Sequence, residues 1–157
     1  MSDSHNRHSY PRARKLNKLY RSMVVGSPPR ASSWRVSQIM RSNRSSGTTP
    51  ELILARFLRR KLVKSKLLGH PDFVFMKARA AVFVQGCWWH QCPTCKIGIP
   101  RTHRAYWGRK LRRNVERDHM IKSELEAKGW KVVEIWEHEL KQNPRAAASK
   151  VKSALSS

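Results

Sequence analysis

Acidic residues are scarce in this sequence. Its 157 residues include 10 Asp and Glu against 33 Lys and Arg, and the formal net charge is +23. Aspartate stands only at positions 3, 72 and 118. A balance this basic is typical of proteins that bind a polyanion, and nucleic acid is the most common one. In such a chain each carboxylate that would face phosphate weakens the attraction, so its presence there needs a chemical reason.

Long apolar runs are also missing. Hydrophobic residues make up 39% of the chain, and no stretch approaches the roughly 18 apolar residues that a membrane-spanning helix needs. Residues 1–7 are polar, and the apolar run of a secretory signal does not follow them. We therefore expect a cytoplasmic protein without a membrane partner, of about one domain in size.

Cysteine is rare, and its three copies all lie between positions 87 and 95. An odd, clustered set is a poor disulfide framework in a reducing compartment and a fair set of metal ligands. In the C-x4-C-x2-C spacing of Cys87, Cys92 and Cys95, the C-x2-C half lets two thiolates reach one tetrahedral metal. The pattern predicts structural zinc, with free or buried thiols as the alternative. Spacing leaves the fourth ligand open among His90, His103, His119 and His138.

Composition divides the chain into three parts. Residues 1–49 hold ten Lys and Arg, eleven Ser and one acid, so we expect a flexible basic arm over 1–36 that either contacts phosphates or remains a solvated tail. A domain follows over 37–143. Residues 144–157 form a C-terminal tail in which Ala146 to Ala148 and Leu155 favour one more short helix.

The periodicity of the middle part predicts a small α/β layer. Thr49, Pro50 and Glu51 are typical of a helix start, and apolar residues at helical spacing extend that helix to Leu62. Two continuous apolar strands at 73–76 and 80–84, joined by a turn, are expected to be covered on both faces. A loop rich in Cys and Trp at 85–108, a helix at 109–128 ended by Gly129, and a strand at 132–136 follow. The outline is a mixed central sheet flanked by helices.

Three carboxylates and a group of aromatic residues are candidates for chemistry. Asp72 directly precedes a buried strand, where a carboxylate can hold Mg²⁺ against a scissile phosphate or simply cap a turn. Asp118 lies within a predicted helix, where an ion pair with an arginine is the alternative, and Glu51 at a helix start can be a capping residue. Trp88 and Trp89, with Tyr106 and Trp107 beyond them, either wedge between bases or pack as a small core around the metal site.

Several blocks of this sequence resemble the very short patch repair (Vsr) DNA mismatch endonuclease family. The blocks are 71–74, 81–90, 106–107, 114–118, 129–132 and 135–137, and they occur in the family's order at near-family spacing. The resemblance covers roughly residues 37–141. It implies a PD-(D/E)XK-like nuclease fold that nicks duplex DNA 5′ to the thymine of a T:G mismatch, the product of 5-methylcytosine deamination. It also implies a monomer, with mismatch-repair proteins as further partners.

The resemblance assigns roles to individual residues. Asp72 corresponds to the central Mg²⁺-binding carboxylate, with the backbone carbonyl of Val84 as a second ligand. His90 matches the general base, with Asp118 as its supporting acid and Glu51 near the metal-bound waters. His138 completes the zinc ligands with Cys87, Cys92 and Cys95. Trp88, Trp89 and Trp107 match the wedge, and the basic residues Arg109, Lys110, Arg112 and Arg113 are expected to grip phosphates.

The sequence also departs from the family pattern. Gln85 stands where family members commonly have His, Cys92 and His138 exchange ligand types with the usual pattern, and the stretch between Leu58 and Pro71 is about ten residues shorter. The shortening predicts that a strand before Asp72 is missing or reduced. The alternative function is therefore a zinc-containing DNA-binding protein that cuts weakly or not at all.

Overall fold

The computed structural model describes residues 29–30, 34, 37–38, 46–62 and 65–156. Apart from residues 29–30 and 34, the basic arm predicted over 1–36 lies outside the described residues. The start of the predicted domain at 37 borders the same undescribed part of the chain, so the fold is described from residue 46 onward.

The described chain forms three strands and four main helices. They run in the order α3 (Thr49–Leu58), β1 (Phe73–Phe75), β2 (Ala80–Gln85), α4 (Arg104–Ala127), β3 (Lys131–Trp136), α5 (Glu137–Gln142) and α6 (Pro144–Ser156). The sheet has the strand order β1-β2-β3. Strand β1 pairs antiparallel with β2, with Phe73 opposite Val82, and β2 pairs parallel with β3, with Val82 opposite Val133. The predicted mixed sheet is confirmed.

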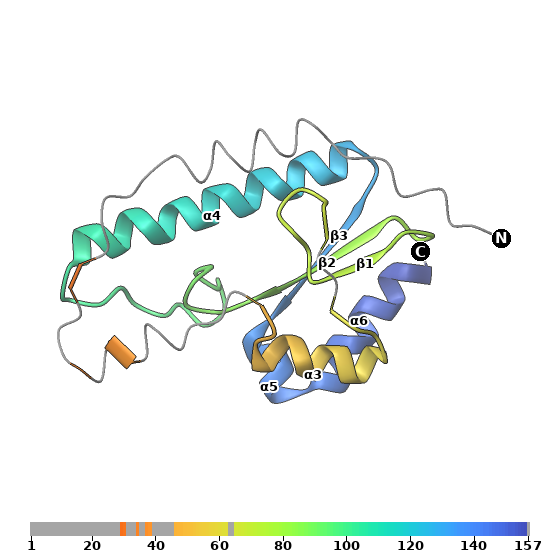
Figure 1. The fold of residues 1–157 in the computed structure, drawn as a ribbon, viewed down its shortest axis with the longest axis horizontal. Helices are drawn as coiled ribbons and strands as arrows, with labels where there is room; N and C mark the ends of the chain where they lie inside the picture. Colours follow the sequence, from red (N-terminus) through yellow and green to blue (C-terminus); the bar gives the residue numbers. More distant parts are fainter. Residues whose placement is uncertain (1–28, 31–33, 35–36, 39–45, 63–64, 157) are drawn as a thin grey trace.

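Helices cover both faces of this sheet (Figure 1), with α4 on one side and α3, α5 and α6 on the other. Side chains alternate along β2, so that Val82 packs in the cluster that Leu54, Leu140 and Val151 complete, whereas Ala81 packs in the cluster with Ile121, Leu125 and Trp130. A strand buried on both faces needs no polar positions. This is why the β2 sequence reads as a continuous apolar run.

Two helix boundaries differ by several residues from the sequence prediction. Helix α3 ends at Leu58 rather than Leu62, because Arg59 adopts a left-handed conformation (φ 52) and its amide caps the carbonyls of Ala55 and Arg56. Helix α4 begins at Arg104, five residues before the predicted start. The loop predicted over 85–108 therefore ends earlier, and its last aromatic residues are helical.

The segment between α3 and β1 is short and closely packed. Within the described parts of this segment, residues 59–62 and 65–72, the backbone forms no strand, in agreement with the shortening noted in the sequence. Gly69 has φ +78, and a Cβ atom added there would lie 2.6 Å from Cγ2 of Ile121 on α4. Glycine is required because the backbone turns and approaches α4 at the same point.

The segment predicted as a C-terminal tail is helix α6, and it belongs to the core. Ala147, Ala148 and Val151 are buried in the cluster beneath the sheet, and the helix packs against α3 and α5. The predicted helix is present and longer than expected. None of the helices among the described residues combines the length and apolar content that a membrane crossing requires.

Candidate functional site

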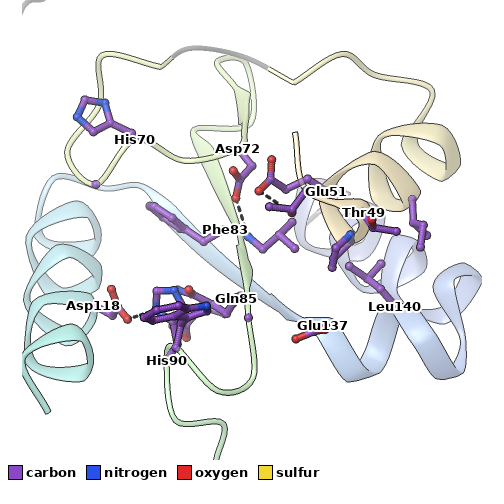
Figure 2. A pocket seen from close by; sticks show the side chains of 18 of the residues that line it. Thr49, Glu51, His70, Asp72, Phe83, Gln85, His90, Asp118, Glu137 and Leu140 are labelled. Carbon is purple, nitrogen blue, oxygen red and sulfur yellow. Dashed lines mark hydrogen bonds and ion pairs between the residues drawn. The ribbon is translucent and has the colours of Figure 1, made fainter. Parts of the chain in front are cut away.

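The predicted catalytic residues line one cleft. It has a volume of about 1340 Å³ and lies between the N-terminus of α3, the end of β2 and the middle of α4. Glu51, Asp72, His90 and Asp118 all line it, together with Val84 and Gln85. Figure 2 shows the carboxylates of Asp72 and Glu51 on the α3 side of the cleft and the His90–Asp118 pair on the α4 side. The fold thus joins four residues that are spread over 68 positions of the chain (from 51 to 118).

Asp72 is held by the strand that follows it in the hairpin. The amide of Val84 donates a hydrogen bond of 2.8 Å to Oδ2 of Asp72, and the amide of Asp72 donates to the carbonyl of Val82 at 2.9 Å. Burial raises the pKa of Asp72 to about 6, the Val84 hydrogen bond lowers it, and the nearby charge of Glu51 raises it further. The protein therefore holds a partly desolvated carboxylate that becomes fully charged only above neutral pH.

Glu51 is the second carboxylate on this side, and it is only 6% exposed. Its Oε2 accepts from the amide of Gly47 at 2.6 Å, and its Oε1 accepts from the hydroxyl of Thr48 at 2.8 Å. Glu51 therefore acts as a capping residue as well as lining the cleft, because it hydrogen-bonds the residues that precede α3. Two neighbouring carboxylates repel each other, and a divalent cation relieves such repulsion. The oxygen donors present suit a hard cation such as Mg²⁺.

His90 and Asp118 form a hydrogen-bonded pair across the cleft. Nδ1 of His90 contacts Oδ2 of Asp118, and the second oxygen of Asp118 receives Arg117 at 3.2 Å. Both members are mostly buried, with side-chain exposures of 21% and 16%. Since Asp118 accepts the Nδ1 proton, the lone pair of the imidazole remains at Nε2. The alternative that Asp118 pairs with an arginine also holds, because Asp118 binds both partners at once.

The three cysteines of the loop that follows Gly86 meet His138. One ligand atom each from Cys87, Cys92, Cys95 and His138 all lie within 4.8 Å of one another. Nδ1 of His138 is 3.4 Å from Sγ of Cys87 and 3.6 Å from Sγ of Cys92. Of the four histidines left open by the spacing, His138 lies in the cluster and His90 in the cleft. Three sulfur donors and one nitrogen donor at this separation suit tetrahedral zinc.

The backbone around this cluster favours thiolates. Burial raises the pKa of Cys92, but hydrogen bonds from the backbone N–H groups of Cys95 and Thr94 and with the side chains of Cys95 and Cys87 together bring the pKa below its usual value. Burial and hydrogen bonds to Cys87 and Cys92 raise the pKa of Cys95 to about 11. Three thiols this close do not all ionise without a cation, which is the behaviour expected of a metal-binding group.

The tryptophans pack on one another beside the cluster. The rings of Trp88 and Trp89 are 4.6 Å apart, and those of Trp88 and Trp107 are 5.2 Å apart, all edge to face. The Nζ atom of Lys110 lies 5.4 Å from the ring centroid of Trp107 and 5.5 Å from that of Trp89. All three indoles are half-buried. The group is therefore a small core in itself that still presents ring surface to a ligand.

The other basic residues assigned to phosphate binding flank Lys110 on α4. Arg109 and Arg112 are exposed, and Arg113 is half-buried. The electrons of aromatic rings attract a cationic group above them. Lys110 therefore contributes to the packing of the aromatic cluster.

The sequence interpretation missed several residues that support the site. The side-chain amide of Asn114 donates to the carbonyl of Trp89 at 3.0 Å, and Oε2 of Glu137 accepts from the amide of Cys87 at 3.2 Å. A hydrogen bond from Lys141, together with that amide, lowers the pKa of Glu137. The one available signal was helical spacing, because Asn114 and Asp118 are four residues apart and so share a face of α4.

Comparison with known proteins gives consistent results. A family model described as DNA mismatch endonuclease Vsr matches residues 32–96. The type II nicking enzyme V.NaeI of Lentzea aerocolonigenes is 42% identical over 121 residues, which cover 71% of this chain and 72% of that enzyme. V.NmeDIP of Neisseria meningitidis serogroup C, also a type II nicking enzyme, is 37% identical over 74% of this chain and 82% of its own length.

The DNA mismatch endonuclease Vsr of Escherichia coli K12 is 35% identical over 86 residues, or 55% of each chain. Identity of 42% over more than two thirds of V.NaeI agrees with the family match. The chain therefore belongs to the Vsr family of DNA mismatch endonucleases.

Proposed function

We propose that this protein is an endonuclease that nicks one strand of duplex DNA 5′ to the thymine of a T:G mismatch. The observation that carries the proposal is the convergence of Asp72, Glu51, His90 and Asp118 on one cleft in a chain whose relatives are named as nicking and mismatch endonucleases. A net charge of +23 supports DNA as the partner. The relatives come from bacteria, whose DNA lies in the cytoplasm, and we place the activity there. We propose that the protein acts as a monomer.

In this proposal Asp72 is the main metal ligand, with the Val84 carbonyl beside it, and Mg²⁺ would stabilise negative charge on the scissile phosphate. Support comes from the position of Asp72, which is fixed by the Val84 amide, and from its proximity to the Glu51 charge. Ionisation of Asp72 is opposed by burial, so the site favours a cation once the carboxylate is charged.

His90 accepts the proton of the attacking water at Nε2. Asp118 fixes the tautomer by accepting at Nδ1, and it stabilises the imidazolium that forms. Arg117 holds the second oxygen of Asp118 and so keeps the carboxylate plane in place. Glu51 orders the entry to α3 through Gly47 and Thr48, and it orients water near the metal ligand.

The Cys87, Cys92, Cys95 and His138 cluster is assigned to structural zinc. It fixes the loop that begins at Gly86 and carries His90, Trp88 and Trp89, so the base and two of the wedge residues have a common support. Inserting Trp88, Trp89 and Trp107 beside a base step costs a few kcal/mol of unstacking, and a mismatch lowers that cost. The choice of mismatched over matched DNA follows from this difference.

The test is a nicking assay on a labelled duplex with one T:G mismatch, with and without Mg²⁺, beside the matched duplex and the Asp72→Ala variant. We expect a Mg²⁺-dependent nick 5′ to the mismatched thymine that disappears in the variant. Tight binding without a nick, across several flanking sequences and with Mn²⁺ also tried, would overturn the proposal and favour a zinc-containing DNA-binding protein. Gln85, which is 6% exposed and lines the cleft, departs from the family pattern. The assay therefore also tests whether the cleft is active with glutamine at this position.

A further inference from the structure

A second cavity lies at the opposite end of α3 from the catalytic cleft. We call it the α3–α6 groove; it is lined by Arg56, Phe57, Leu58 and Arg59 at the end of α3 and by Arg145, Ala148, Ser149 and Lys152 on α6. Its volume is about 920 Å³. None of the residues assigned above to catalysis, zinc or DNA wedging lines it.

The lining of the α3–α6 groove carries charge of one sign. Four of its residues are Arg or Lys, and none is acidic. On α6 the positions 145, 148, 149 and 152 follow the spacing of one helical face, so Arg145 and Lys152 project from the same side of the helix. Helix α6 contains no acidic residue, and the one acid of α3, Glu51, lies in the other cleft.

The cations of the groove differ from four lysines of the described structure that are neutralised by glutamates. Lys122, Lys128 and Lys141 each pair with a glutamate, and Lys150 on α6 itself pairs with Glu139 at 3.0 Å. No ion pair between the described residues involves Arg56, Arg59, Arg145 or Lys152, and all four are exposed. Unneutralised guanidinium and ammonium groups around a concave surface suit a phosphate-bearing ligand.

We propose that the α3–α6 groove binds the phosphodiester backbone of DNA outside the catalytic cleft. The proposal rests on DNA being the substrate, as proposed above. Arg56 and Arg59 follow Glu51 by five and eight residues on α3, which corresponds to about 8–12 Å along the helix axis. Successive phosphates of one strand rise about 3.4 Å along B-form DNA, so the groove is within reach of phosphates a few nucleotides from the nick.

The experiment measures DNA affinity against salt in Mg²⁺-free buffer, with a fluorescent T:G duplex as the probe. The variant is Arg145→Glu/Lys152→Glu, and the matched control is Lys66→Glu/Lys77→Glu, which changes the net charge equally at exposed positions that line neither cavity. Loss of two phosphate contacts lowers the salt slope by about 1.8, so the affinity of the wild type should fall about tenfold more than that of the variant between 50 and 200 mM salt. The control should keep a slope close to that of the wild type.

Equal slopes for the groove variant and the control would overturn the proposal, because only net charge would then matter. The neutral variant Arg145→Gln/Lys152→Gln repeats the test without introducing carboxylates, and unchanged thermal unfolding verifies the fold. A second arm shortens the duplex from one end, and we expect the affinity difference between wild type and variant to vanish once the groove has no DNA to bind. If instead a polyglutamate peptide binds wild type but not the variant while the DNA slopes match, the groove serves an acidic protein partner and the proposal is wrong.

The outcome is separable from that of the proposed function. The groove variants should nick at the wild-type rate when DNA is saturating, since none of the substituted residues lines the catalytic cleft. A wild-type protein that never nicks but shows the groove-dependent salt slope would remove the proposed activity and leave the DNA-binding groove in place.

Discussion

The cysteine cluster and the cleft are assembled in different ways. The cysteine cluster takes three of its four members from the loop 87–95 and the fourth from α5. The cleft takes one residue each from α3, the start of the β1 hairpin, the cysteine loop and α4. Most of the cysteine cluster therefore comes from one short stretch of chain, and three neighbouring thiols suit a metal ion. The residues of the cleft come from the whole fold, which holds the carboxylates of Glu51 and Asp72 near each other in a largely buried place.

We therefore expect the two sites to change the free energy of unfolding in opposite directions. Structural metal binding adds folding free energy, whereas a buried carboxylate beside another carboxylate lowers it. The raised pKa of Asp72 is the sign of that strain.

Replacing Asp72 by Asn should abolish nicking and stabilise the metal-free protein. Removing the main metal ligand forfeits several kcal/mol of transition-state stabilisation, or on the order of a thousandfold in rate. Because the folded pKa of Asp72 is about 6, above its usual 3.8, the ionised carboxyl destabilises the fold above pH 6, and stability should rise as the pH falls from about 6 toward 4. The variant should lack this pH dependence, gaining up to about 3 kcal/mol at pH 7.

The measurements are single-turnover nicking and thermal unfolding in chelator-treated buffer across that pH range. Glu126→Gln, which removes an exposed carboxylate of α4 that does not line the cleft, is the control. A lower melting temperature in Asp72→Asn would show that the carboxylate stabilises the fold, and it would contradict the expected difference between the two sites.

Replacing Cys92 by Ser should do the reverse and weaken the fold. Losing a buried ligand lowers metal affinity and removes several kcal/mol of folding free energy, which for a chain of this size lowers the melting temperature by on the order of 10 °C. Zinc content per chain, measured by atomic absorption, should drop in parallel. Stripping zinc from the wild type should reproduce the loss, and a variant that melts with the wild type would contradict a structural metal.

Replacing Asp118 by Asn should reduce nicking by about 100-fold, a typical contribution of an oriented general base. The amide no longer fixes the tautomer of His90 by accepting at Nδ1. DNA affinity should stay close to that of the wild type, since neither residue is assigned to binding. Asp118→Glu provides the matched comparison, because it keeps the charge and should recover part of the rate.

Replacing Arg117 by Gln should give the smallest change. The contact of Arg117 with Asp118 is partly solvent-exposed, at 39% on the arginine side, so its loss should cost about 1 kcal/mol, or roughly fivefold in rate. The rate at saturating DNA is the informative readout. An unchanged rate with weaker DNA binding would assign Arg117 to phosphate contact instead of positioning.

The sequence predicted the sheet well because its signals are local. The strands are marked by continuous apolar runs around Phe73 and Val82, which involve residues that are neighbours in the chain. The C-x2-C spacing of the cysteine cluster is local in the same way. The end of α3 and the start of α4 were missed because they depend on backbone geometry at Arg59 and His103, both in the left-handed region that nonglycine residues rarely adopt. The pairing of Asp118 with both His90 and Arg117 and the role of Asn114 required tertiary contacts that no single-chain pattern contains.

Helix α4 carries Trp107 near its first turn and Asp118 eleven residues later, followed by Ile121 and Leu125, which anchor it against the sheet. One continuous helix fixes the spacing of these points, and the rise of an α-helix sets the first two about 16 Å apart along its axis. In the proposed function, helix α4 therefore fixes the distance between the aromatic residues that contact the duplex and the residues that cut it. An insertion in α4 between these two residues should move the cleavage position or abolish cutting, whereas substitutions on its exposed surface leave this distance unchanged.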